Sequence, residues 1–84
     1  MKYVVKIIHQ AQKDLDTLEN RYFEPIKNKI LSLAATPRSF GCQKLTNEEG
    51  TRIRVGDFRI LYRIDDKAKE IIIYRIKHPK NVYQ

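Results

Sequence analysis

Four arginines in residues 51–64 have the chemistry to bind phosphate. Arg52 and Arg54 precede a Gly56-Asp57 turn, and Arg59 and Arg63 follow it. A guanidinium group is planar and keeps its charge, so it can hold two oxygens of one phosphate at once. Such groups would also stabilise the charge that gathers on the phosphoryl oxygens when an RNA 2′-hydroxyl attacks the adjacent phosphorus. RNA is therefore the leading candidate partner.

The arginines alternate with apolar residues, as expected for two strands of a hairpin. Side chains two apart on a strand share a face, so Arg52 and Arg54 should lie opposite Ile53 and Val55. After the turn, one face should carry Arg59, Leu61 and Arg63, and the other Phe58, Ile60, Tyr62 and Ile64. The pattern predicts one basic and one apolar sheet face. A solvated face of an antiparallel sheet would show the same alternation without any ligand.

The remaining elements predict how this hairpin is supported. A strand is expected at about residues 3–8, followed by an amphipathic helix with Ala11, Leu15 and Leu18 on its apolar side. A second helix should begin near Tyr22, with Pro25 in its first turn, and end before Pro37. Residues 38–50 read as a loop with a short strand at 44–45, and strands follow at 51–55, 58–64 and 70–77. The 84 residues predict one α+β domain of order β-α-α-β-β-β, with both helices on a mainly antiparallel sheet.

Composition narrows the classes of partner and cofactor. The net charge is +7, and residues 51–84 hold nine Lys/Arg against four Asp/Glu. This balance favours a polyanion or an acidic protein and does not separate the two. Neither a membrane segment nor a signal peptide is expected, which predicts a cytoplasmic protein. One cysteine, two distant histidines and three scattered glycines predict no metal site and no cofactor.

The chain resembles the RelE/ParE superfamily of toxin–antitoxin toxins. The resemblance rests on the predicted element order, on RIRVGDFRILYRI at 52–64, and on the tail HPKNVY at 78–83. It is most similar to the RelE branch, which implies a ribosome-dependent endoribonuclease that cleaves mRNA. It also implies a cognate antitoxin whose acidic or amphipathic segment covers the basic sheet face, with the ribosome and mRNA as further partners.

The resemblance implies roles for individual residues. Arg52, Arg54 and Arg59 match basic residues of the family hairpin, and Tyr83 matches a tyrosine near the C-terminus, so these four are the candidate catalytic residues. The tail departs from the family at Pro79, where RelE-like chains usually carry an arginine. Candidates to replace that arginine and bind RNA are Arg75, Lys77, His78 and Lys80.

Two alternatives remain open at this point. A ParE-like inhibitor of DNA gyrase would share the fold and perform no chemistry. A nucleic-acid-binding module without toxicity would use the basic face for phosphate contacts alone, and its affinity would fall steeply with salt.

Overall fold

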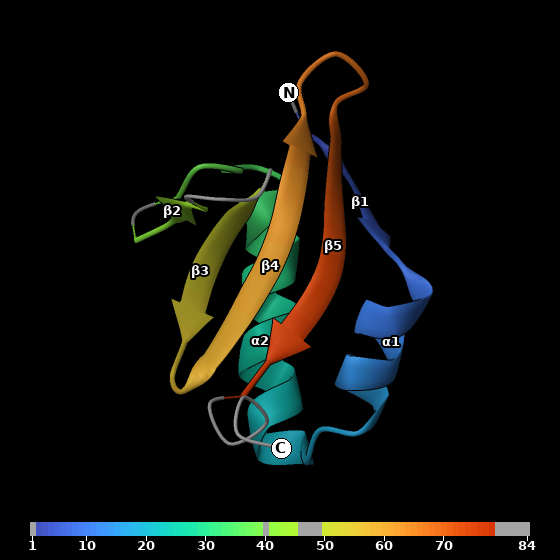
Figure 1. Cartoon of the computed structure of the whole chain (residues 1–84), viewed down its shortest axis with the longest axis vertical. Coiled ribbons are helices and arrows are strands. Elements are labelled where there is room, and N and C mark those ends of the chain that lie inside the picture. Colours follow the sequence, from blue (N-terminus) through green and yellow to red (C-terminus); the bar gives the residue numbers. More distant parts are fainter. Residues whose placement is uncertain (1, 40, 46–49, 79–84) are drawn as a thin grey trace.

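The computed structural model describes residues 2–39, 41–45 and 50–78 and contains two layers (Figure 1). One layer is a five-stranded sheet in the order β1-β5-β4-β3-β2. Its strands are β1 (Val4–Ile7), β2 (Gln43–Lys44), β3 (Thr51–Val55), β4 (Phe58–Asp65) and β5 (Glu70–Lys77). The other layer holds α1 (His9–Asp16) and α2 (Asn20–Leu33). The predicted α+β order is confirmed, with β2 one residue earlier than expected.

The last three strands form an antiparallel meander, in agreement with the predicted mainly antiparallel sheet, whereas β1 is an edge strand that pairs in parallel. β1 pairs in parallel with β5, so the first and the last strand within the described residues are neighbours. The turn between β3 and β4 has Gly56 at φ +60°. A positive φ at the first central residue matches the right-handed twist of a hairpin and favours glycine there.

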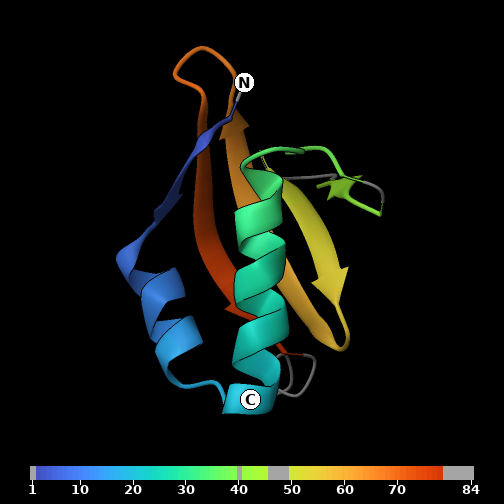
Figure 2. The same cartoon turned by 180° about the vertical axis from the view of Figure 1, so that it is seen from behind.

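Both helices are amphipathic, and α2 covers one face of the sheet (Figure 2). Ile26, Ile30 and Leu33 of α2 and Ala11 and Leu15 of α1 are buried. They pack against the inward side chains of the sheet, namely Ile53, Phe58, Ile60, Tyr62, Ile71, Ile73 and Ile76. The apolar face predicted for the hairpin is therefore the core face, and its arginines lie on the open face. No helix within the described residues is long and apolar enough to span a membrane.

The expected position of Pro25 in the first helical turn is wrong. α2 begins at Asn20, so Pro25 is its sixth residue and lies in the second turn. A proline there has no N–H to donate to the carbonyl of Arg21. Both Pro25 and Arg21 are exposed residues. The helix extends further toward the N-terminus than the proline suggests because Tyr22 and Phe23 pack against the core.

Candidate nucleic-acid interface

Three cations cross the open face of the sheet on neighbouring strands. Arg54 of β3 lies directly opposite Arg59 of β4, and Arg59 lies directly opposite Lys77 of β5. None of the three makes an ion pair with any carboxylate within residues 2–39, 41–45 and 50–78. Like charges at opposed strand positions repel one another. We call this set the cationic row; its arrangement favours binding of an anion.

Arg52 lies next to the cationic row and is held by a neutral side chain. Its Nε and Nη2 donate to Oε1 of Gln43, at 3.2 and 2.7 Å. Gln43 is the residue directly opposite Arg52 on β2. Sequence reasoning missed Gln43, because nothing in the sequence fixes the register of a two-residue strand.

The arginines surround a hollow of about 150 Å³. Its lining consists of Gly41, Gln43, Arg52, Arg54 and Arg59. This volume equals the share of about five water molecules in the liquid, so a phosphodiester group has room to enter. The three predicted hairpin arginines thus converge on one site, which we call the arginine hollow.

Gly41 shapes the rim of the arginine hollow. Its φ is +92°, a conformation that residues with a side chain rarely adopt. The space around it is open, since a Cβ at this position would meet no atom within 4 Å. Backbone conformation, rather than crowding, therefore favours glycine where the chain turns into β2.

The segment that leads to β2 is anchored at two points. The hydroxyl of Tyr62, a fully buried residue of β4, donates to the carbonyl of Pro37 at 2.8 Å. Burial raises the pKa of this hydroxyl, so it stays protonated and able to donate. Arg38, one residue further, donates from Nη2 and Nη1 to the two carboxylate oxygens of Asp66, at 2.9 and 3.3 Å. These anchors fix the approach to Gly41 and Gln43.

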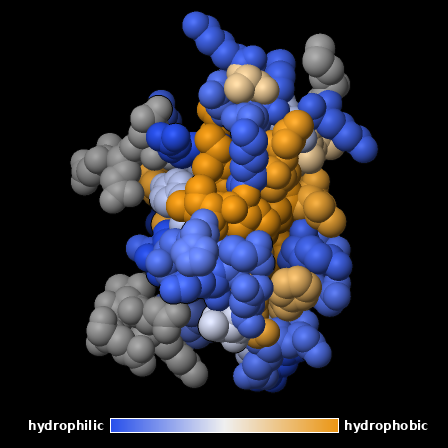
Figure 3. All heavy atoms as spheres, turned by 90° about the vertical axis from the view of Figure 1, so that its right-hand side faces the viewer, coloured by the Kyte–Doolittle hydropathy of each residue, from blue (hydrophilic) through white to orange (hydrophobic). Residues whose placement is uncertain are grey.

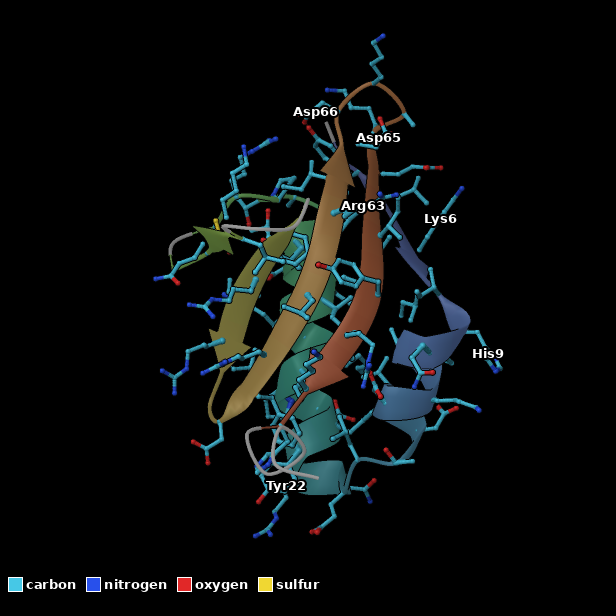
Figure 4. The ribbon with its side chains drawn as sticks, in the orientation of Figure 1. Lys6, His9, Tyr22, Arg63, Asp65 and Asp66 are labelled. Carbon is cyan, nitrogen blue, oxygen red and sulfur yellow. The ribbon has the colours of Figure 1, made fainter. Side chains whose placement is uncertain are left out.

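Asp66 connects three distant segments, and Figure 4 shows it beyond the end of β4, at the turn into β5. It also accepts a hydrogen bond from the hydroxyl of Tyr3 at 2.7 Å. Hydrogen bonds from Arg38 and then from Tyr3 lower the pKa of Asp66 to about 2, and the same ion pair raises the pKa of Arg38. We call the group Tyr3, Arg38 and Asp66 the clasp.

Arg75, one of the predicted RNA-binding residues, is directed to α1 and does not line the arginine hollow. Its Nε donates to Oδ2 of Asp14 at 3.0 Å, and the same oxygen accepts the backbone N–H of Ile76 at 2.9 Å. The pairing of β4 with β5 shifts register at Leu61/Tyr62. This irregularity places Ile76 in the core and leaves Arg75 and Lys77 opposite Leu61 and Arg59. The two cations differ in their surroundings because Asp14 pairs with Arg75 and not with Lys77.

The other predicted tail residues divide into one that packs and two that lie outside the described residues. The ring of His78 is 4.7 Å from that of Phe58, edge to face, and Phe58 in turn contacts Tyr22 at 5.1 Å. His78 therefore extends an aromatic cluster at the end of the core. Lys80 and Tyr83 are outside the described residues, as is Pro79.

A comparison with models of protein families identifies the family of this chain. Residues 5–83 match the model of the ParE toxin of the type II toxin–antitoxin system parDE. The chain belongs to the RelE/ParE superfamily of toxins. The predicted resemblance is thereby confirmed over nearly the whole chain.

Three proteins that are similar to this chain carry RelE-type names. Toxin RelG of Mycobacterium tuberculosis is 30% identical over 86 residues, covering 100% of this chain and 99% of the relative. The toxin–antitoxin complex RelBE2 of the same organism contains a chain with a TM-score of 0.84 and 28% identity, over 93% of this chain and 99% of that one. A chain of the archaeal RelE–RelB complex of Pyrococcus horikoshii has a TM-score of 0.79 and 30% identity, over 93% and 96%.

Proposed function

We propose that this RelE/ParE toxin is an endoribonuclease that cleaves mRNA on the ribosome. The observation that carries the proposal is the convergence of Arg52, Arg54 and Arg59 on one hollow. Within the described residues none of these cations pairs with a carboxylate, and such cations on neighbouring strands are suited to the phosphodiester group of RNA. Such a toxin acts in the cytoplasm, where translating ribosomes are found.

The reaction needs charge stabilisation and two proton transfers. The RNA 2′-oxygen bonds to phosphorus and loses its proton, while the bond from phosphorus to the 5′-oxygen breaks and that oxygen gains a proton. Arg54 and Arg59 would hold the non-bridging oxygens, on which negative charge gathers. This contribution is typically worth about a hundredfold or more in rate for each donor.

Proton transfer explains why a ribosome would be required. Guanidinium groups do not give up a proton in proteins, and an amide does not titrate. The described lining of the arginine hollow therefore offers charge and orientation without a general base. An enzyme of this kind depends on RNA that another scaffold already holds in a reactive conformation. Ribosome-bound mRNA meets that need.

Alanine at position 59 tests the proposal. Arg59→Ala should lower cleavage of a defined mRNA on purified ribosomes by about a hundredfold, because one fixed cation is removed from the transition state. Lys29→Ala is the matched control, since it removes the same charge from α2, which covers the opposite face of the sheet. Cleavage that persists undiminished in both Arg59→Ala and Arg54→Ala would overturn the proposal.

A cognate antitoxin is the second proposed partner. RelBE2 and the archaeal RelE–RelB complex are toxin–antitoxin complexes.

Figure 3 shows apolar side chains gathered on the side formed by β1 and α1. Val4 of the edge strand β1 and Leu31 of α2 are each 60% exposed. A neighbouring groove of about 330 Å³ is lined by Val5, Ile7, Gln12, Leu15, Phe23, Lys27, Ile30 and Leu31. An amphipathic antitoxin segment would bury this surface, and an acidic segment would cover the cationic row.

Antitoxin binding and RNA cleavage should be separable by mutation. Leu31→Asp places a charge on the apolar surface and should weaken antitoxin affinity about tenfold or more. The same variant should cleave mRNA at the rate of the unchanged protein, because Leu31 does not line the arginine hollow. Affinity measured by calorimetry beside the ribosome assay checks both halves, and unchanged affinity would exclude this surface from the interface.

Inhibition of DNA gyrase is the second candidate function. The match to the ParE toxin model over residues 5–83 favours it. A gyrase inhibitor would block DNA supercoiling and leave transcripts uncut on the ribosome. Supercoiling by purified gyrase, measured beside mRNA cleavage, distinguishes the two functions.

A further inference from the structure

We propose that Gln43 is the positioning residue for Arg52, fixing its guanidinium so that the free edge faces the phosphodiester group in the arginine hollow. This inference deepens the proposed function and rests on it. Gln43 lies directly opposite Arg52 in the sheet register, and its Oε1 accepts from both Nε and Nη2. Two bonds to one acceptor restrict rotation of the guanidinium plane.

The N–H bonds of Arg52 that Gln43 does not use define the free edge of its guanidinium group. A guanidinium carries five N–H bonds, and Gln43 takes one from Nε and one from Nη2. Of the remaining three, one on Nη1 and one on Nη2 lie along the end of the fork, which can hold two oxygens of one phosphate. Gln43 therefore occupies the side edge and leaves the end edge for the ligand.

The neutrality of Gln43 distinguishes Arg52 from two other arginines of the chain. Arg38 is held by the carboxylate of Asp66 and Arg75 by that of Asp14, and neither lines the arginine hollow. An amide orients a guanidinium as a carboxylate does, but it does not cancel the positive charge. Of Arg38, Arg52 and Arg75, Arg52 is the one whose positive charge is not cancelled by its hydrogen-bond partner and stays available to an anion.

The amide nitrogen of Gln43 adds a further donor at the same place. Because Oε1 must face the two N–H groups of Arg52, Nε2 forms the other arm of the amide. Its two hydrogens cannot bond to Arg52, which has no acceptor. Gln43 itself lines the hollow, so its side chain both supports Arg52 and borders the ligand.

Leucine at position 43 tests the inference, since it is close in size and has no acceptor. Gln43→Leu should lower kcat/KM for ribosome-dependent mRNA cleavage about tenfold, the effect of losing hydrogen bonds to a charged group. In an Arg52→Ala background the same change should lower kcat/KM by much less, because the positioning role of Gln43 acts through Arg52. Gln43→Glu keeps the acceptors and adds a negative charge, and it should also lower kcat/KM.

Each outcome of these substitutions at positions 43 and 52 has a distinct meaning. Full activity of Gln43→Leu, or an equal loss with and without Arg52, would overturn the positioning role. Full activity of Gln43→Glu would overturn the argument from neutrality. The Nε–H resonance of Arg52, identified by its loss in Arg52→Ala, should shift in Gln43→Leu, and an unchanged resonance would contradict the contact itself. If the unsubstituted protein cleaves no mRNA, the proposed function fails, and the role of Gln43 in cleavage fails with it.

Discussion

Arg54 and Arg59 face each other across β3 and β4, and Lys77 continues their row onto β5. Elsewhere in the described chain, Arg38 and Arg75 are neutralised by carboxylates. The cationic row therefore opposes folding slightly until an anion binds. Functional sites commonly keep such unfavourable arrangements at some cost in stability.

Removing one charge from the row should stabilise the free protein. Arg54→Gln is expected to raise the free energy of unfolding by about 0.3 kcal/mol at low salt, because a directly opposed like charge is lost. The gain should shrink in 0.5 M salt, where screening already weakens the repulsion. Urea unfolding at both salt concentrations measures this, with Arg38→Gln as the control that removes a paired arginine. A loss of stability in Arg54→Gln at both concentrations would show that the row is not repulsive.

The C-terminal part of strand β5 extends beyond β1 and forms hydrogen bonds with α1 instead. β1 pairs with β5 only as far as Ile73. Beyond that point the carboxylate of Asp14 accepts the N–H of Ile76 and the Nε of Arg75. The helix thus supplies an acceptor that a neighbouring strand would otherwise provide. This contact holds the end of β5 that carries Lys77 to the cationic row.

Alanine at position 14 should loosen this end of the sheet. Asp14→Ala is expected to lower the free energy of unfolding by about 1–3 kcal/mol, since a backbone donor and a guanidinium both lose their acceptor. Asp16→Ala, on the same helix and exposed, should change it by less than about 0.5 kcal/mol. Equal effects of the two substitutions in urea unfolding would contradict a special role for Asp14.

The elements differ in how well the sequence predicts them. Alternation correctly predicts β3 as residues 51–55 and the core face of β4, because one buried face requires a period of two. The bounds of β5 are also as predicted, but the sequence does not show the irregularity beside Leu61/Tyr62 that places Ile76 in the core. An extra residue in a strand leaves no mark in composition. The contact of Arg52 with Gln43 likewise depends on register across a loop, so only the three-dimensional structure reveals it.

The clasp joins segments from the start, the middle and the end of the chain. Asp66 at the turn between β4 and β5 binds Arg38, which follows α2, and Tyr3, which precedes β1. Arg38 and Asp66 are exposed and Tyr3 is partly buried. Figure 4 shows Asp66 at the opposite end of the molecule from Tyr22. The clasp therefore restrains the overall arrangement of the two layers from outside the core.

Acid should release the clasp. The pKa of Asp66 is lowered from an ordinary 3.8 to about 2, so the folded state holds its proton less tightly than the unfolded chain. The resulting stabilisation is present above pH 3.8 and is lost as the pH falls toward 2. Asp66→Asn should consequently be less stable than the unsubstituted protein at pH 6, and the two should converge near pH 2. Thermal unfolding at both pH values checks this, and a difference that is independent of pH would refute it.

The parallel pairing of β1 with β5 also has a consequence for biosynthesis. The two strands are separated by almost the whole chain, yet β5 lies between β1 and β4 in the sheet. A nascent chain cannot complete this sheet until β5 has left the exit tunnel, because contacts between sequence-distant strands form only after both are available. Lys77 joins the cationic row at the same moment. Folding of this domain therefore waits for the synthesis of β5, and a chain truncated before β5 would lose the fold together with the site.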